Sequence, residues 1–154
     1  MDKRMFLFLL SAVPSLAVDH PSHPDRELAN VLREREDNLK RRADLIDKNV
    51  AGGLAENLSP SASVEARKAL LAFRRDRAAD IGEKIRIQQE IVQLCAQAAF
   101  NAEKRYKSGT GNALDCMNAK EWELEARQNL LEWQLRQEQE AAHRQASGPA
   151  PSGS

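Results

Sequence analysis

The sequence predicts an all-α protein made of two tandem antiparallel αα-hairpins of long coiled-coil helices. Three observations support this prediction. Apolar residues recur at helical spacing between the chain ends, no stretch shows a convincing strand pattern, and glycines and prolines gather at a few positions that separate the periodic segments. We expect four helices, or three if the middle pair forms one kinked helix, because a single glycine inside a helix costs only about 1 kcal/mol.

The N-terminal 17 residues resemble a secretory signal peptide. Lys3 and Arg4 precede a short apolar run, and small residues lie at the two positions that a signal peptidase reads before Val18. The apolar run is far shorter than the roughly 20 residues needed to span a bilayer. We therefore assign residues 1–17 to a signal peptide and expect an exported mature chain.

Two further segments flank the helical hairpin domain, which we place at residues 25–146. Residues 18–24 contain two prolines and are expected to form an extended segment, whereas residues 147–154 are rich in Gly, Pro and Ser and are expected to be disordered. Lysine and arginine together number 23, as do aspartate and glutamate, so the formal net charge is zero. A neutral chain has no overall field to recruit nucleic acid, and we expect no such partner.

A gap-free internal match at an offset of 60 residues indicates a duplicated hairpin. The equivalent pairs include Val64 with Leu124, Glu65-Ala66-Arg67 with Glu125-Ala126-Arg127, Leu70-Leu71 with Leu130-Leu131, Phe73 with Trp133, and Asn49 with Gly109. Asn and Gly most readily take the left-handed conformation that ends a helix. A chance match of heptads is the alternative, but the shared turn, triplet and aromatic favour duplication, with units at about 25–79 and 80–146.

Each unit is expected to form a helix, a glycine-containing turn and a return helix. The expected elements are helices at about 25–50, 61–78, 81–108 and 113–145, with turns at 51–53 and 109–112. Asp80, followed three residues later by Glu83, resembles a capping box. Asn112 is expected to cap the last helix, with Asp115 in its first turn, where a negative charge complements the helix dipole.

Apolar residues in the third predicted helix form a coiled-coil seam. The seam contains Ile81, Ile85, Val92, Cys95, Ala99, Ala102 and Tyr106, with Gln88 filling its one gap. We interpret Cys95 as a small buried hydrophobe rather than a reactive thiol. Cys95 and Cys116 differ in height along the hairpin by roughly 15 Å at 1.5 Å per residue. This separation argues against an intramolecular disulfide and leaves an intermolecular one through Cys116 as an alternative.

The last predicted helix is apolar on two opposite faces. One face carries Leu114, Met117, Leu124, Leu131 and Leu135, and the other carries Ala119, Trp122, Ala126, Leu130 and Trp133. Such a helix needs neighbours on both sides, as in the wall of a helical barrel, in an inner position of a layer or at an oligomer interface. We assign Trp122, Ala126, Leu130 and Trp133 to a helix-packing or oligomer face, the alternative being a hairpin core with an incidental patch opposite.

Three segments around the second turn carry a recognisable pattern: Arg105-Tyr106-Lys107-Ser108-Gly109, then Leu114 to Lys120, then Glu125-Ala126-Arg127 with Leu130-Leu131. Over about 35 residues this pattern resembles the hairpin-tip signature of the outer membrane efflux (TolC-like) family. The resemblance implies a periplasmic tip at which Arg105, Tyr106, Gly109, Leu114 and Asp115 meet an efflux adaptor protein. Family members are longer and carry β-strands that complete an outer-membrane barrel, and the sequence shows none.

The sequence contains no combination typical of an active site. Its imidazoles are His20, His23 and His143, and none accompanies a nucleophile elbow or a pair of carboxylates. We therefore expect neither catalysis nor a cofactor. One metal hypothesis remains: after cleavage the chain would begin Val18-Asp19-His20, whose four nitrogens suit Cu(II) or Ni(II), with His23 assisting.

The leading hypothesis is a non-enzymatic periplasmic or outer-membrane-associated helical protein that contacts an envelope efflux partner through its tip. The first alternative is a self-associating periplasmic coiled-coil protein with a structural or chaperone-like role. The second is an N-terminal copper or nickel binder. We expect a homo-oligomer under either of the first two hypotheses.

Overall fold

A computed structural model describes residues 23–53 and 61–146, and this part of the chain is all helical. Its elements are α1 (His23–Ala51), α2 (Ala62–Arg77), α3 (Ile81–Lys107) and α4 (Ala113–Ala146). The all-α prediction is confirmed. The middle pair is two helices rather than one kinked helix, because Ala78 has an extended backbone with ψ of 135°. The predicted signal peptide, the Val18-Asp19-His20 site and the C-terminal tail lie outside the described residues.

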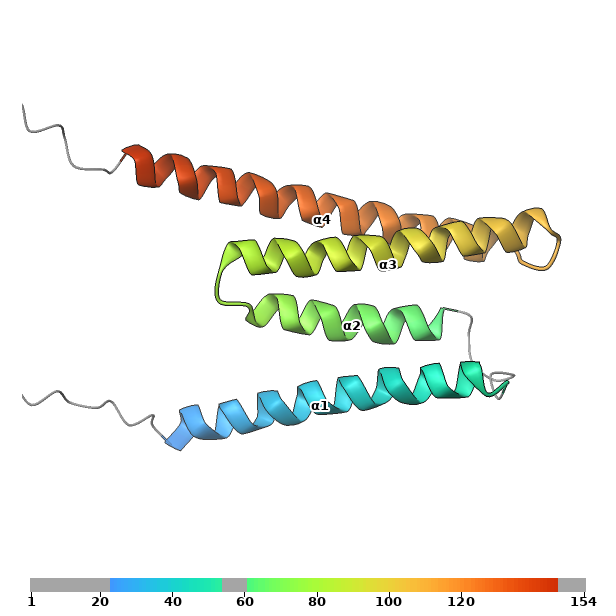
Figure 1. Cartoon of the computed structure of the whole chain (residues 1–154), viewed down its shortest axis with the longest axis horizontal. Helices are drawn as coiled ribbons and strands as arrows, with labels where there is room; N and C mark the ends of the chain where they lie inside the picture. Colours follow the sequence, from blue (N-terminus) through green and yellow to red (C-terminus); the bar gives the residue numbers. More distant parts are fainter. Residues whose placement is uncertain (1–22, 54–60, 147–154) are drawn as a thin grey trace, which may run out of the picture.

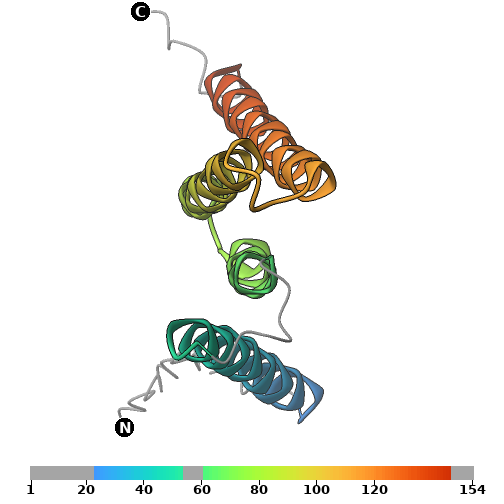
Figure 2. The ribbon, with the colours of Figure 1, turned by 90° about the vertical axis from the view of Figure 1, so that its right-hand side faces the viewer.

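The four helices form one folded layer in chain order, each antiparallel to the one before it (Figure 1). In the view along the helices they follow one another in a staggered row from α1 to α4 (Figure 2). Packing joins α1 to α2, α2 to α3, and α3 to α4. The helix α2 lies in an inner position with a neighbour on each side, whereas α1 and α4 form the edges of the layer. None of the described helices is long and apolar enough to cross a membrane.

The main core cluster lies where α2, α3 and α4 meet. It consists of the buried residues Ile91, Cys95 and Ala126, against which Leu71, Ala72, Val92 and Trp122 pack. Towards the α3–α4 turn a second cluster contains only alanines, at positions 99, 102 and 119, whose small side chains let the two helices approach closely.

Cys95 is fully buried, as predicted, and burial raises the pKa of its thiol. Both cysteines are free thiols.

Gln88 connects the three helices that surround the core. Its side chain is fully buried on α3. The Gln88 Oε1 accepts a hydrogen bond of 2.6 Å from the Arg75 guanidinium on α2, and Nε2 donates one of 2.8 Å to the Ala126 carbonyl on α4. A buried amide is costly unless its polar atoms are paired, so this bridge restricts how α2 and α4 sit against α3.

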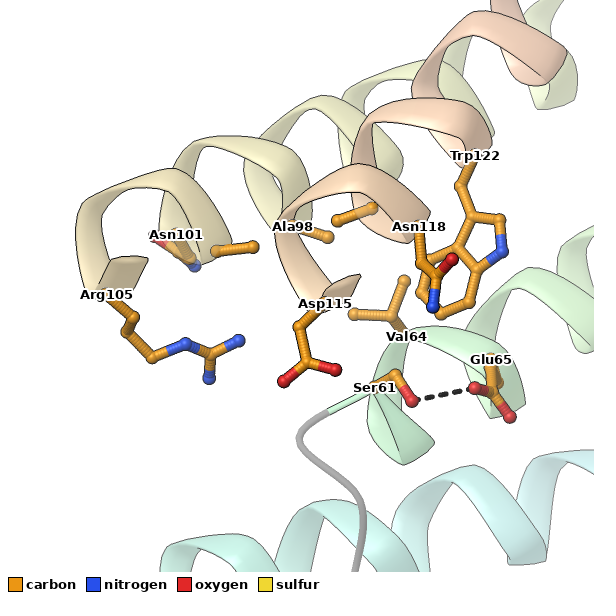
Figure 3. A pocket seen from close by; sticks show the side chains of 11 residues that line it. Ser61, Val64, Glu65, Ala98, Asn101, Arg105, Asp115, Asn118 and Trp122 are labelled. Carbon is orange, nitrogen blue, oxygen red and sulfur yellow. Dashed lines mark hydrogen bonds between the residues drawn. The ribbon is translucent and has the colours of Figure 1, made fainter. Parts of the chain in front are cut away.

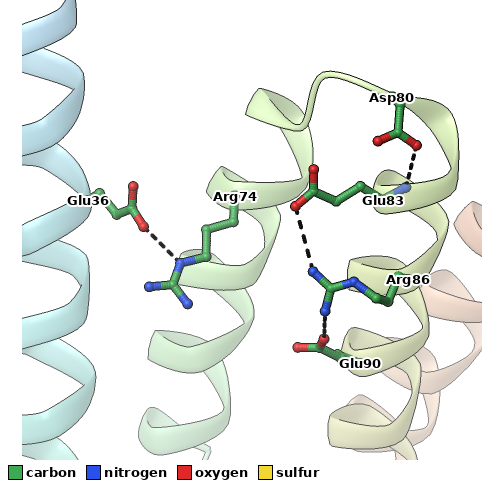
Figure 4. A network of polar contacts seen from close by, with 6 residues as sticks. All are labelled: Glu36, Arg74, Asp80, Glu83, Arg86 and Glu90. Atoms are coloured by element: carbon green, nitrogen blue, oxygen red, sulfur yellow. Dashed lines mark hydrogen bonds and ion pairs between the residues drawn. The ribbon is translucent and has the colours of Figure 1, made fainter.

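Polar contacts join α1 to α2 at two places along the helices. Near its C-terminal end, Asp47 accepts hydrogen bonds from Ser63 and Arg67. Further towards its N-terminus, Glu36 pairs with Arg74 at 2.9 Å (Figure 4). Ala43 is the one α1 side chain in the described part of the chain that is buried. The α1–α2 contact therefore buries a single alanine on the α1 side, whereas α2 contributes the buried ring of Phe73, over which Arg35 of α1 lies.

Two ends of predicted elements differ from the structure. Asn49 lies inside α1, and Gly53 takes the left-handed conformation with φ of 71°. The predicted turn role of Asn49 is therefore wrong, because glycine adopts this conformation without the steric cost that a Cβ imposes. At the other end, α1 begins at His23 rather than at residue 25. Pro24 is compatible with the first helical turn because its missing N–H would have no partner within the helix.

The prediction that Asp80 caps the start of α3 is confirmed. The Asp80 carboxylate accepts a hydrogen bond of 2.9 Å from the Glu83 backbone N–H. The Glu83 carboxylate does not return to Asp80 as in a full capping box but lies 3.6 Å from Arg86, which also pairs with Glu90 (Figure 4). The Asp80 side chain therefore caps the start of α3 without a reciprocal contact from the Glu83 side chain.

We predict that Gln88→Met lowers the free energy of unfolding by about 1–3 kcal/mol, because it leaves the Arg75 guanidinium without its buried acceptor. Urea unfolding followed by circular dichroism measures this change. Gln89→Met is the matched control, since Gln89 is exposed on the same helix and its replacement should change stability by less than about 0.5 kcal/mol. Equal losses in both variants would contradict the bridging role.

We also predict that acid loosens α1 before the rest of the layer. The hydrogen bond from Ser63, and then that from Arg67, lowers the pKa of Asp47 below its ordinary value of 3.8. The contact thus stabilises the folded chain fully above the unfolded pKa and is lost as pH falls through the lower, folded pKa. Amide NMR signals of α1 should weaken below about pH 4 before those of α3 do.

Asp47→Asn should weaken the α1 amide protection at neutral pH and remove most of its acid dependence. Asp44→Asn changes an exposed carboxylate on the same helix and serves as the control. If Asp44→Asn matched Asp47→Asn, the assignment to the Ser63 and Arg67 contacts would be incorrect.

Candidate partner-binding tip

The turn between α3 and α4 is closed by the backbone carbonyl of Arg105. This oxygen accepts hydrogen bonds from the Thr110 N–H at 3.0 Å, the Gly111 N–H at 3.1 Å and the Ser108 hydroxyl at 2.9 Å. Gly109 has φ of 75°, the left-handed conformation that its position predicted. A Cβ on Gly111 would lie 3.0 Å from the Arg105 Cβ, so the turn has no room for a side chain there. The tip is therefore a compact turn that several hydrogen bonds to one carbonyl hold closed.

Asn112 caps α4 as predicted. Its Oδ1 accepts a hydrogen bond of 2.8 Å from the Asp115 N–H, and its Nδ2 donates one of 2.9 Å to the Asp115 carboxylate. This reciprocal pair fixes the first turn of α4 and holds the Asp115 carboxylate near the positive end of the helix dipole.

A cavity of about 260 Å³ lies between the start of α2 and the tip. Its polar lining residues are Ser61, Glu65, Asn101, Arg105, Asp115 and Asn118, and its apolar lining includes Val64 and Trp122. In Figure 3 the Arg105 guanidinium points towards the Asp115 carboxylate across the opening, and the Trp122 ring lies further in beside Val64. On the α2 side, the Ser61 hydroxyl donates to the Glu65 carboxylate at 2.7 Å.

The structure divides the predicted tip residues between different surfaces. Arg105 and Asp115 share the cavity. Tyr106 is exposed and faces a groove between α3 and α4 that also contains Phe100 and Cys116. Leu114 is exposed at the beginning of the apolar face of α4. The tip therefore offers a cavity with charged residues at its opening and, beside it, an exposed aromatic and an exposed leucine.

The predicted packing face of α4 is covered by the chain itself. Ala126 is buried in the main core cluster, and Trp122 packs against this cluster. The Lys68 ammonium lies 5.8 Å from the ring centre of Trp122, and Lys84 lies 5.1 Å from that of Trp133. Leu130, on the same face, is partly buried. This face is thus occupied within one chain, and the opposite face of α4 is the open one.

Several residues of the site are not marked by the sequence pattern. Asn101 lines the cavity but belongs to no sequence pattern, and Asn118 lines it from within the Leu114 to Lys120 segment, where it was not assigned to the site. The participation of Ser61 and Glu65 depends on where α2 begins relative to the tip. Phe100 could have been noticed, because it lies outside the α3 seam and is 62% exposed. A large aromatic off the seam of a coiled-coil helix is a signal for a surface contact.

Glu123 forms an ionic cluster on α4, next to the Tyr106 groove. It is buried, and its carboxylate pairs with Lys120 and with Arg127, each at 2.7 Å. The hydrogen bond from Lys120, followed by the charge of Arg127, lowers the pKa of Glu123. Both cations lie on the same helix, so the cluster stabilises α4 without requiring another element.

Within residues 23–53 and 61–146, no group of three or more His, Cys, Asp or Glu side chains could hold a metal ion. His20 of the hypothetical copper or nickel site lies outside these residues, and His23 begins α1.

No family model, curated protein or solved structure matches the chain.

We predict that Gly109→Ala loosens the tip and costs about 1–2 kcal/mol, the penalty for a Cβ in the left-handed conformation. Hydrogen exchange of the Thr110 and Gly111 amides should accelerate. Gly53→Ala is the control, because it imposes the same backbone strain at the other turn and should leave tip exchange unchanged. Unaltered exchange in Gly109→Ala would show that the turn tolerates a side chain.

Proposed function

We propose that this chain is a non-enzymatic helical protein that binds a protein partner at the α3–α4 tip. One observation carries the proposal. The backbone and short polar side chains of the tip close the turn, whereas the larger side chains of Arg105, Tyr106 and Leu114 remain exposed. Among the described residues, none makes a hydrogen bond or ion pair with the Arg105 guanidinium. Exposed arginine and tyrosine on a rigid support are typical of binding hot spots.

The cavity beside the tip supports the same function. Its volume of about 260 Å³ lies below the roughly 300–1,000 Å³ of most small-molecule sites. It suits one inserted side chain of a partner better than a whole ligand. Trp122 provides an apolar wall, and Arg105 and Asp115 provide one charge of each sign at the opening. A partner with an apolar anchor flanked by polar groups would match this arrangement.

The partner that we propose is an envelope protein, and specifically a periplasmic adaptor of an efflux system. Support for this step comes from the sequence: residues 1–17 resemble a signal peptide, and the tip resembles that of TolC-like proteins. Under this proposal the mature chain resides in the periplasm and associates with the outer membrane through its partners.

A photo-crosslinking amino acid in place of Tyr106 in the full-length chain tests this function. We expect an adduct with a periplasmic adaptor protein in intact cells, identified by mass spectrometry. Arg105→Ala should reduce the adduct by about tenfold, the effect of losing 1.4 kcal/mol of binding energy. The same crosslinker at Leu45, an exposed position on α1, is the control.

The crosslinking results and the mass of the mature chain separate the binding tip, the efflux assignment and export from one another. Equal adducts from Tyr106 and Leu45, or none from Tyr106, would contradict a binding tip. A tip-specific adduct with a different envelope protein would keep the tip and remove the efflux assignment. A mature mass that still includes residues 1–17 would contradict export through a cleaved signal peptide.

A further inference from the structure

The outer edge of α4 carries an apolar stripe that no described helix covers. The stripe consists of Leu114, Met117, Leu124, Leu131 and Leu135, which are between 49% and 68% exposed. Leu114 and Leu135 occupy a positions of a heptad, and the other three occupy its d positions. Glu121 and Gln128 fill the two remaining a positions. Because α2 and α3 pack on the opposite side of α4, the stripe has the spacing of a coiled-coil seam without a second strand.

In the first predicted repeat unit, the helix equivalent to α4 is α2, and its corresponding face has a neighbouring helix. At the offset of 60 residues, Leu131 of the stripe corresponds to Leu71 of α2, and Leu124 corresponds to Val64. Leu71 packs on the main core cluster, and Val64 lines the cavity beside α3. The equivalent face of α2 is therefore a helix-packing surface. In α4, at the end of the layer, the same face has no described helix to pack against.

Charges beside the stripe indicate which helix would fit it. Lys120 and Arg127 occupy g positions on one side, and Glu125 and Glu132 occupy e positions on the other. In a parallel pair of α4 helices, each g residue meets the e residue five positions later on the second copy. Lys120 then faces Glu125, Arg127 faces Glu132, and symmetry doubles both contacts. An antiparallel pair would instead bring cations to cations and carboxylates to carboxylates.

We propose that two copies of this chain associate through a parallel two-stranded coiled coil of their α4 helices. Met117, Leu124 and Leu131 pack against their counterparts at d positions, where leucine favours two strands. Gln128 hydrogen-bonds to its counterpart across the seam, whereas Glu121 faces an identical carboxylate and weakens the pair. The interface is a two-fold symmetric one in which the same surface serves both copies.

Contacts within one chain are compatible with this dimer. Lys120 and Arg127 already pair with Glu123, and Glu125 already pairs with Lys68. The side chains of Lys120, Arg127 and Glu125 nevertheless remain 55–57% exposed. The second copy therefore extends these ion pairs into networks and does not need to break them. Parallel alignment also places both tips at the same end of the dimer, so one partner assembly can engage both.

Sedimentation analysis of the purified chain tests the association. We expect a dimer that Leu124→Asp weakens by at least about tenfold. Glu121→Leu should strengthen it by about tenfold, since it replaces a like-charge layer of the seam with an apolar one. Leu45→Asp is the matched control, because it alters a leucine on α1, at the other edge of the layer, that is at least as exposed as Leu124. Circular dichroism checks that each variant keeps its helical content.

A disulfide cross-link tests the orientation. In a Cys116→Ser background, Leu114→Cys should link two copies under mild oxidation, because the two positions adjoin in a parallel pair. In an antiparallel pair they would be about 25 Å apart and would not link. A wild-type chain and a Glu121→Leu variant that both remain monomeric would overturn the proposal. So would loss of the dimer in Leu45→Asp, which would place the contact on α1, or a dimer that Leu114→Cys fails to link.

Discussion

A fully buried amide holds three of the four helices in register. Gln88 accepts from Arg75 on one side and donates to the Ala126 carbonyl on the other. Apolar contacts are not directional, and the small side chains of Cys95 and Ala126 would tolerate several sliding positions. A paired amide does not, because each shift would leave a buried polar atom without a partner. The core is thin, and this contact gives it a single arrangement.

Stability is distributed unevenly across the layer. The α3–α4 hairpin has a continuous interface of small and apolar residues, from the main core cluster to the alanines near the tip. The α1–α2 contact depends on carboxylates, guanidinium groups and the buried ring of Phe73, over which Arg35 lies at 5.0 Å. Exposed ion pairs contribute little each, so we expect α1 to be the element that separates first. The candidate binding tip therefore belongs to the most firmly packed hairpin.

The two predicted repeat units present different surfaces. In the first unit the return helix α2 is covered on both sides, and Asn49 lies within a helix instead of at a turn. In the second unit the turn at Gly109 presents exposed side chains, and the return helix α4 keeps one face open. The first unit packs against the second through α2. The second supplies both the tip that we propose for partner binding and the stripe that we propose for self-association.

Local chemistry determined most of the helical framework directly from the sequence. Periodicity located the helices to within a few residues, Asp80 and Asn112 marked two helix starts, Gly109 marked a left-handed turn, and the seam identified Cys95 as buried. These features depend on residues close together in the chain. The tertiary structure alone decided which face of α4 is covered, how Gln88 is paired, and that Glu65 of α2 joins Arg105 at one cavity, because each depends on contacts between distant segments.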